Sequence, residues 1–490
     1  MRNSILLRFM SLATLFMSVL LVTFSCNQND HPPNILLITV DDLGWADLGC
    51  YGADLHETPN IDAFAETAQK FTQAYAAAAI CTPTRAALLT GKSPAKLNMT
   101  IWREAATNSL FNQKLIPPDV SANLPLEEVT IAEALKAAGY VTAHLGKWHV
   151  GDGEHFPELQ GFDINVGATV WGCPPTFFYP YRGEIYRSFR FVPGLERGVN
   201  GQYSLNRDGE YLTDRLTDEA ISIMERFKKK PFFLNLSYYT VHTPIEGKKA
   251  LVEYYQKAKT SGMSHQNAMY AAMVHSLDEN VGKLMNALDQ LDLADHTIVL
   301  FTSDNGGFIN EWAGQTVTDN TPLRSGKGAL YEGGIRVPTI IRWPGTTIPN
   351  TTSDYPITTQ DFYPTLLEMV DLRGDSSQIA AFDGISLVPI LKNPQADVDQ
   401  RALYWHYPHY YPTTTPVGAI RQGDWKLLQF FEDSHLELYN LREDVGEKNN
   451  LEKENPEKAQ ELLELLRVWR RQGDAPMPQS NPDYSNTQTL

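Results

Sequence analysis

The sequence predicts an α/β protein, with a large, mixed but mostly parallel sheet sandwiched by helices and a small C-terminal antiparallel sheet carrying one helix. Continuous apolar, β-branched runs at 34–40, 231–238 and 297–302 are typical of strands buried on both faces. Amphipathic helical segments separate them. Near residue 394 the pattern changes to alternating strands, so we expect a catalytic domain at 34–393 and a subdomain with a tail at 394–490.

Each element of the large domain has a local signal. Thr58-Pro59 starts a helix, and residues 70–75 alternate as in a strand. Thr130 and Glu133 fit a capping box for a helix over 130–139, which a strand at 140–145 follows. The other expected elements are helices at 212–227, 264–291 and 361–372, strands at 402–407, 417–430 and 436–441, and a last helix at 456–471. Segments 97–124 and 161–201 lack regular patterns and are expected to be long loops.

The composition excludes one class of partner. The chain has 490 residues, 42% hydrophobic and 20% charged, as in ordinary globular proteins, and its net charge is −17. Binding to nucleic acid requires a basic face, so no nucleic-acid partner is expected. An anionic substrate would need a locally cationic pocket within this acidic protein.

The N-terminal segment predicts export. Residues 1–25 are typical of a signal peptide. Thr23-Phe24-Ser25-Cys26 looks like a loose bacterial lipobox, in which Cys26 would be lipidated; simple cleavage near Ser25 is the alternative. Residues 26–33 would form a polar tether. We therefore expect a bacterial periplasmic or outer-membrane-anchored protein that meets the membrane only through this lipid anchor.

The four cysteines do not form a disulfide framework. Export explains Cys26, and Cys81 belongs to the motif described next. Cys50 and Cys173 are expected as two separate buried thiols, although pairing in an oxidising periplasm stays open.

A thiol stands at the start of a predicted helix in Cys81-Thr82-Pro83-Thr84-Arg85, which continues to Leu89-Thr90-Gly91-Lys92. Pro83 is favoured in a first helical turn and Gly91 ends a helix. Arg85 lies four residues on from Cys81, on the same face, beside unsatisfied backbone N–H groups. This arrangement binds anions, and the thiol is expected to have a lowered pKa and to act as a nucleophile, with a buried structural cysteine as the alternative.

Oxygen ligands follow two of the predicted parallel strands. Asp41 and Asp42 come after 34–40, and Asp304 and Asn305 come after 297–302. Ligands bind at the carboxyl edge of such sheets, so these four side chains are expected to form an oxygen cage. Such a cage suits Ca²⁺, with Mg²⁺ as the alternative, and does not suit Zn²⁺.

Cations and titratable bases follow further strands. Lys147 and His149 are two residues apart after 140–145 and project to the same side in extended chain. His242 follows 231–238, and Lys327 stands between glycines, where it can approach an anion closely.

Together these motifs resemble the signature of type I, formylglycine-dependent sulfatases, which have the alkaline phosphatase-like fold. The resemblance rests on the Cys81 motif, Asp41-Asp42-Leu43-Gly44-Trp45, Gly146-Lys147-Trp148-His149 and the segment from Lys327 to Gly334, and it extends from Asn34 to about Leu441. One departure is Thr84, where many members have Ser.

The resemblance implies hydrolysis of sulfate esters. A formylglycine-generating maturation enzyme would oxidise Cys81 to an aldehyde, whose hydrate is the nucleophile. One calcium ion would be held by residue 81 and by Asp41, Asp42, Asp304 and Asn305. Arg85 and Lys147 would stabilise charge, His242 assisted by Lys327 would protonate the leaving group, and His149 would take the proton of the second hydroxyl, so that sulfate leaves.

The chain also resembles carbohydrate sulfatases of polysaccharide-degrading bacteria. This implies a sulfated galactose or N-acetylgalactosamine unit of a polysaccharide or glycosaminoglycan as substrate. Candidate substrate-binding residues lie in the loops and after the first small-domain strand: Trp102, Arg103, Trp171, His406 and His409, with Tyr410 and Tyr411 beside them. A phosphomonoester or phosphonate hydrolase of the same fold, or a non-catalytic glycan-binding lipoprotein, are the alternatives.

Overall fold

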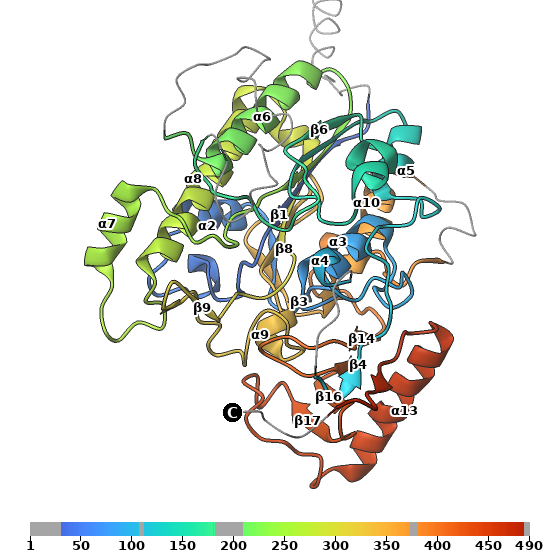
Figure 1. Cartoon of the computed structure of the whole chain (residues 1–490). Helices are drawn as coiled ribbons and strands as arrows, with labels where there is room; N and C mark the ends of the chain where they lie inside the picture. The colour runs from blue at the N-terminus through green and yellow to red at the C-terminus, as the bar shows by residue number, and fades with distance from the viewer. Residues whose placement is uncertain (1–30, 107–111, 180, 182–208, 373–380, 485–490) are drawn as a thin grey trace, which may run out of the picture. The chain divides into compact units, whose positions relative to one another are not determined.

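An eight-stranded sheet, ordered β12-β2-β11-β8-β1-β7-β5-β6, forms the centre of this computed structural model (Figure 1). Its strands are β1 Asn34–Val40, β2 Gln69–Phe71, β5 Val141–Gly146, β6 Ile164–Val166, β7 Phe232–Ser237, β8 Thr297–Ser303, β11 Thr339–Arg342 and β12 Thr351–Ser353. Strands β8, β1, β7, β5 and β6 are parallel, whereas β11 runs antiparallel to β8 and β2. The predicted fold class is confirmed.

The structure describes residues 31–106, 112–179, 181, 209–372 and 381–484. The predicted signal peptide, Cys26 and much of the segment 161–201 lie outside this range. Residues 33–490 group into one unit, and the description below concerns that unit. Within the described ranges, no helix combines the length and the apolar character needed to cross a bilayer.

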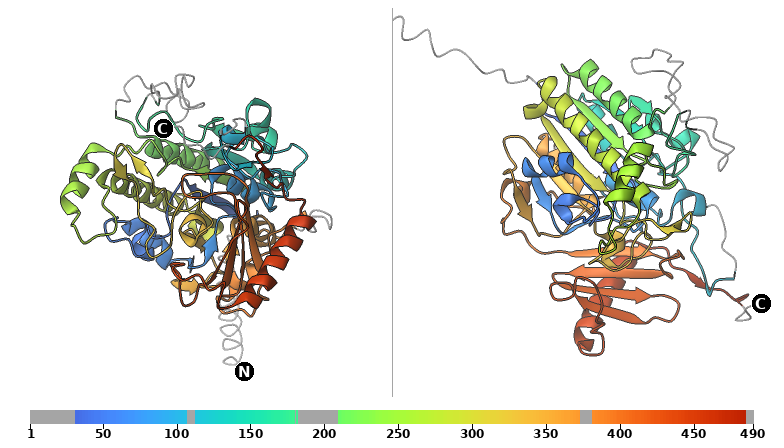
Figure 2. Two further views of the ribbon diagram at one scale, coloured as in Figure 1. Left: turned by 60° about the horizontal axis from the view of Figure 1, so that its bottom comes forward. Right: turned by 90° about the vertical axis from the view of Figure 1, so that its left-hand side faces the viewer.

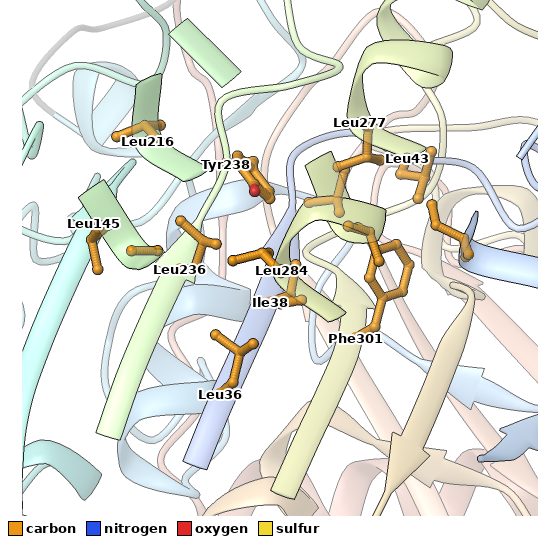
Figure 3. Close-up of a cluster of buried hydrophobic side chains, with 14 of the residues drawn as sticks. Leu36, Ile38, Leu43, Leu145, Leu216, Leu236, Tyr238, Leu277, Leu284 and Phe301 are labelled. Atoms are coloured by element: carbon orange, nitrogen blue, oxygen red, sulfur yellow. The ribbon is translucent and has the colours of Figure 1, made fainter. Parts of the chain in front are cut away.

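Helices cover both faces of the sheet because apolar residues of β1 alternate between two cores. Leu36 and Ile38 pack with helices α2 Pro59–Glu66, α6 Leu212–Phe227 and α8 Ala268–Gln290 (Figure 3). Ile35 and Leu37 face α3 Cys81–Thr90, α5 Ile131–Ala137 and α10 Phe362–Met369 on the opposite side (Figure 1). Each fully buried aliphatic side chain contributes about 1.5–3 kcal/mol, so this double core keeps the carboxyl ends of the strands in fixed positions.

A four-stranded antiparallel sheet follows in the chain, with strands β14 Ala402–Tyr407, β15 Val417–Gln422, β16 Trp425–Phe430 and β17 Leu436–Asn440. One face packs on α13 Pro456–Gln472 (Figure 2), where Leu427 and Leu462 belong to one apolar cluster. The other face packs on the large domain, where Leu428 joins a cluster that includes Ile80, the residue before Cys81. The boundary predicted at 393/394 falls just after α12 Val388–Lys392.

Several predicted bounds were wrong. The segment 417–430 is a hairpin rather than one strand, because Gly423, at φ +58°, turns the chain between β15 and β16. The segment 70–75 divides into β2 and β3 Ala74–Tyr75. The helix expected from 264 begins at Ala268, after Asn267 caps it by accepting from the backbone N–H groups of Met269 and Tyr270. The sheet also includes β6, inside the segment expected to be irregular.

The remaining elements are short, except for one helix that the sequence pattern did not predict. That helix is α7 Lys249–Ala258. The short elements include α4 Arg103–Ala106, α9 Glu332–Ile335, and the two-stranded pairs β4 Leu115–Ile116 with β18 Gln479–Ser480, β9 Glu311–Trp312 with β10 Gln315–Thr316, and β3 with β13 Ile357–Thr358. Cys50 and Cys173 do not pair with each other; Cys173 is buried as expected, but Cys50 is only half-buried.

Candidate active site

The predicted polar residues meet at the carboxyl edge of the parallel strands. Asp41 and Asp42 leave β1, and Asp304 leaves the adjacent β8. Lys147 follows β5, whose Gly146 pairs with Ser237 at the end of β7. Because these strands are parallel neighbours, their ends align and the side chains come together.

Three buried carboxylates face three buried cations. Lys147 Nζ lies 2.7 Å from Asp41 Oδ2, and Lys327 Nζ donates to Asp42 at 2.8 Å. Arg85 Nη2 lies 2.7 Å from Asp304 Oδ2. Arg85 also donates to the Lys147 carbonyl and to the Ser237 hydroxyl, which fixes its plane against the end of β7.

The carboxyl groups differ in their pKa values. Burial tends to raise the pKa of each carboxyl group. For Asp42 the charges of Lys327 and His242 outweigh burial, and its pKa is lowered. For Asp304 the charges of Arg85 and Lys147 outweigh burial, and its pKa is lowered as well. Burial instead raises the pKa of Asp41 to about 8, although Lys147 opposes it. A further cation beside Asp41 would keep this carboxylate ionised.

Cys81 occupies the first position of α3, with its Sγ 3.6 Å from Asp41 Oδ1. Burial raises the pKa of the thiol to about 12 and outweighs Lys147 and Lys327. The expectation of a lowered thiol pKa was therefore wrong, because the sequence pattern includes the helix N-terminus but not the desolvation. The unmodified thiol is neutral at pH 7 and is a poor nucleophile.

The donor set fits a hard divalent cation. The side chains of Asp41, Asp42, Cys81 and His242 offer ligand atoms that all lie within 4.8 Å of one another. Asn305 donates its Nδ2 to Asp42 Oδ1 at 2.8 Å, while its buried Oδ1 has no hydrogen-bond partner among the described residues. An unsatisfied amide oxygen beside carboxylates is a ligand that Ca²⁺ prefers.

His149 is held by a residue that the sequence analysis did not identify. Its Nε2 lies 2.7 Å from Oε2 of Glu104, which α4 carries. Burial lowers the pKa of His149 to about 4, with Lys147 and Arg85 adding to the effect and Glu104 opposing it. His149 is therefore neutral at pH 7 and can accept a proton.

His242 and Lys327 lie together on the other side of Asp42. His242 Nε2 is 3.6 Å from Asp42 Oδ2, and its Nδ1 lies 2.9 Å from the Thr243 carbonyl oxygen, to which it can donate. Burial and the Lys327 charge lower the pKa of His242 to about 3. Burial would also lower the pKa of Lys327, but Asp42 outweighs it and raises this pKa, so Lys327 is charged.

A cavity of about 370 Å³ opens onto this set. Its wall contains ionisable side chains and aromatic rings. The lining residues are Ile80, Cys81, Trp102, Glu104, His149, Trp171, Gly172, Cys173, His242, Lys327 and Tyr411. Trp102 and Tyr411 meet edge to face, with ring centroids 5.6 Å apart. A volume of this size suits a small ligand with an apolar face.

Four of the candidate substrate-binding residues do not line the cavity. Tyr410 donates its hydroxyl to Glu432 at 2.7 Å. Arg103 is paired with Asp152 at 2.5 Å. His406 Nε2 lies 2.7 Å from the Pro476 carbonyl oxygen, and His409 Nε2 lies 2.8 Å from Thr100 Oγ1. Both histidines are buried. Trp102, Trp171 and Tyr411 do lie in the wall.

Glu104, Gly172 and Cys173 were missed because they lie in segments without a regular pattern. No local signal distinguishes Glu104 from other acidic residues of the loop 97–124. Its place beside His149 depends on how that loop folds back over the sheet edge.

The fold and this buried set of acids, cations and imidazoles are typical of a hydrolase that acts on an anionic ester. Residues 33–372 match the model of the sulfatase family, and the chain belongs to that family. Residues 326–471 also match the model of the N-sulphoglucosamine sulphohydrolase C-terminal region.

The chain is similar to several proteins over most of its length. A sulfatase of Formosa agariphila is 34% identical, over 91% of this chain and 90% of that protein. The N-acetylgalactosamine-6-O-sulfatase of Bacteroides thetaiotaomicron is 31% identical, over 90% and 93% of the two chains. The crystal structure of Ps i-CgsB superposes with a TM-score of 0.73 at 29% identity and covers 94% of this chain and 96% of that one.

Proposed function

We propose that this sulfatase removes O-sulfate from a carbohydrate, namely a galactose or N-acetylgalactosamine unit of a polysaccharide or glycosaminoglycan. The observation that carries the proposal is that one cavity combines the acid and base groups with Trp102, Trp171 and Tyr411. Aromatic faces suit the apolar faces of sugar rings.

The relatives support a galactose-configured sugar. One is named N-acetylgalactosamine-6-O-sulfatase, and Ps i-CgsB was also solved in complex with an oligosaccharide, k-i-k-neocarrahexaose. The sulfate position and the choice between endo and exo action depend on the loops around the cavity.

Residue 81 requires modification to act. Oxidation of Cys81 to formylglycine supplies a hydrated aldehyde oxygen as nucleophile and an exit for sulfate by C–O cleavage. The neutral thiol supports this requirement. Because Cys81 is only 2% exposed, a maturation enzyme would have to act on it before folding.

Asp41, Asp42, Asp304 and Asn305, with residue 81, would hold one calcium ion, which supplies positive charge to sulfate oxygens. When all three carboxylates are ionised, Arg85, Lys147 and Lys327 balance them. A divalent cation then leaves the pocket with a net charge of plus two, which favours a sulfuryl group over a neutral ligand.

Other side chains of the site stabilise charge and transfer protons. Arg85 and Lys147 stabilise negative charge at residue 81 and on the sulfuryl oxygens. Lys327 and His242 lie where they can deliver a proton to the leaving-group oxygen; negative charge from the bound sulfate ester would raise the low pKa of His242 toward the protonated form. His149 accepts the proton of the second hydroxyl.

We further propose that residues 1–25 direct export and that Cys26 attaches a lipid. These assignments rest on the sequence pattern alone.

The test begins with the protein produced alongside a formylglycine-generating enzyme. The mass of the peptide that contains residue 81 should fall by the difference between thiol and aldehyde. Sulfate release is then measured on galactose and N-acetylgalactosamine sulfated at different positions, with an aryl sulfate and an aryl phosphate in parallel. Preference for the phosphate would favour a phosphohydrolase, and sugar binding by an unconverted protein without turnover would favour a glycan-binding lipoprotein.

A further inference from the structure

The Glu104 carboxylate is fixed at both oxygens. Its Oε2 lies 2.7 Å from His149 Nε2, and its Oε1 accepts from the Gly172 backbone N–H at 3.1 Å. Burial would raise the pKa of Glu104, but the charge and hydrogen bond of His149 lower it to about 2. An ionised carboxylate only accepts, so the proton of a neutral His149 lies on Nε2.

The other ring nitrogen of His149 is left as a base. Nδ1 is buried and has no hydrogen-bond partner in the part of the chain that the structure describes. With the proton on Nε2, Nδ1 carries a lone pair. His149 and residue 81 line the same cavity, so the imidazole that carries this lone pair lies at the proposed reaction site.

The ring is packed as well as hydrogen-bonded. A Cβ atom at Gly172 would lie 2.5 Å from His149 Cε1, so the imidazole rests directly on the glycine backbone. The Thr82 hydroxyl donates to the His149 carbonyl oxygen at 2.7 Å and accepts from the Arg103 backbone N–H at 3.2 Å. These contacts join α3, the loop after β5 and the Glu104 segment.

We propose that Glu104 is the positioning residue of the base: it fixes the tautomer and orientation of His149, so that Nδ1 takes the proton in the step that releases sulfate. This role rests on the proposed function. The Nδ1 lone pair removes the proton from the free hydroxyl of hydrated residue 81, the O–H electrons form the C=O bond, and sulfate leaves with the electrons of the C–O bond. Glu104 then faces an imidazolium, which its charge stabilises, and the proton passes to water.

The first experiment measures the tautomer in the unconverted protein, with Cys81 intact, so it does not depend on sulfatase activity. Histidine labelled with ¹⁵N is used, and the His149 signals are assigned by their loss in His149→Gln. We expect the Nε2–H tautomer in the wild type and a mixture, or Nδ1–H, in Glu104→Ala. An Nδ1–H tautomer in the wild type, or identical His149 signals in both proteins, would overturn the proposal.

The second experiment uses the converted enzyme and an aryl sulfate. Glu104→Gln and Glu104→Ala are expected to lower kcat about 10–100-fold with little change in KM. Since His149 acts after the phenol has left, both variants should release phenol in a fast stoichiometric burst followed by a slow phase. Asp152→Asn, which breaks the ion pair of the neighbouring Arg103 in the same loop, should keep near-normal turnover and show no burst.

Other outcomes also decide the question. A raised KM with unchanged kcat would assign Glu104 to substrate binding. An equal loss of kcat in Asp152→Asn would show that Glu104 only keeps the loop folded. If the wild type itself shows no turnover, the proposed function fails. The tautomer measurement still tests whether Glu104 fixes the tautomer of His149.

Discussion

Gly172 sets how closely the His149 imidazole can approach the cavity wall. Replacement by Ala would place a Cβ atom 2.5 Å from Cε1 of the ring, so the ring would have to move. We expect Gly172→Ala to lower kcat about tenfold or more, since a displaced base loses its alignment. Gly153→Ala is the matched control, because no atom lies within 4 Å of its added Cβ. Equal kinetics for the two variants would contradict this account.

Asp47 is a buried anchor for the turn that carries the proposed calcium ligands Asp41 and Asp42. Its carboxylate accepts from the Gly44 backbone and from the Tyr270 and Thr318 hydroxyls, each at 2.6 Å. His265 lies between Asp47, at 3.3 Å, and Asp54, at 2.7 Å. Burial would lower the pKa of His265, but the two carboxylates raise it to about 9.

This raised pKa predicts a pH-dependent stability. A group with a raised folded pKa contributes fully below its unfolded pKa of about 6.5, and the contribution disappears as the pH rises through about 9. His265→Gln should therefore lower the unfolding free energy by about 2–3 kcal/mol near pH 6 and by much less above pH 9. His435→Gln, at an exposed histidine, is the control. Denaturation by urea across this pH range measures the difference, which must shrink at high pH.

The small sheet is joined to the large domain by a buried ion network. Lys426 of β16 is fully buried and lies 2.9 Å from Glu332 at the start of α9 and 2.9 Å from Glu447. Glu332 also accepts from the Tyr75 hydroxyl at 2.7 Å. Lys426 thus compensates Glu447, and it shares the compensation of Glu332 with Arg336, which lies 3.4 Å from that carboxylate.

Removal of this cation should destabilise the protein strongly. Lys426→Met leaves Glu332 and Glu447 close together, and we expect the unfolding free energy to fall by about 3–5 kcal/mol. Lys458→Met, at a surface pair on α13, should change it by less than about 0.5 kcal/mol. A loss below about 1 kcal/mol in Lys426→Met would show that the carboxylates simply take up protons.

The small sheet also shapes the cavity. Tyr411 follows β14 and lines the cavity above Gly328, where φ is +90° and an added Cβ would lie 2.1 Å from the Tyr411 ring. Thr413 donates to the Lys327 carbonyl oxygen at 2.7 Å. The C-terminal residues therefore set one wall of the pocket, beside a residue that faces Asp42.

A bound calcium ion should stabilise the whole molecule, because its ligands come from the ends of adjacent central strands. Calcium at a hundredfold excess over its Kd should add about 2.7 kcal/mol and raise the unfolding temperature. Cys81→Ala should abolish turnover but keep this calcium response, whereas Asn305→Ala should weaken the response. Substantial sulfate release by Cys81→Ala would refute residue 81 as the nucleophile. The measurement is thermal unfolding with calcium and with a chelator.

Local sequence patterns are enough to predict the fold class, the central elements and the convergence of the acids, cations and histidines at one edge of the sheet. Those signals are local: the capping box of Thr130 and Glu133 is present as predicted, and parallel strands necessarily align the residues that follow them. The turn at Gly423 also has a local signal, because Gly423-Asp424 interrupts the apolar pattern and is typical of a two-residue hairpin loop.

Contacts between distant segments decide which loop residues reach the cavity and how burial and neighbouring charges shift their pKa values. Glu104 reaches the cavity from a loop, and Tyr411 reaches it from the segment after β14 of the second sheet. Arg103, His406 and His409 instead contact Asp152, Pro476 and Thr100 outside the cavity. The high pKa of Cys81 likewise follows from burial. Desolvation and loop packing depend on contacts between distant segments, and no local pattern contains that information.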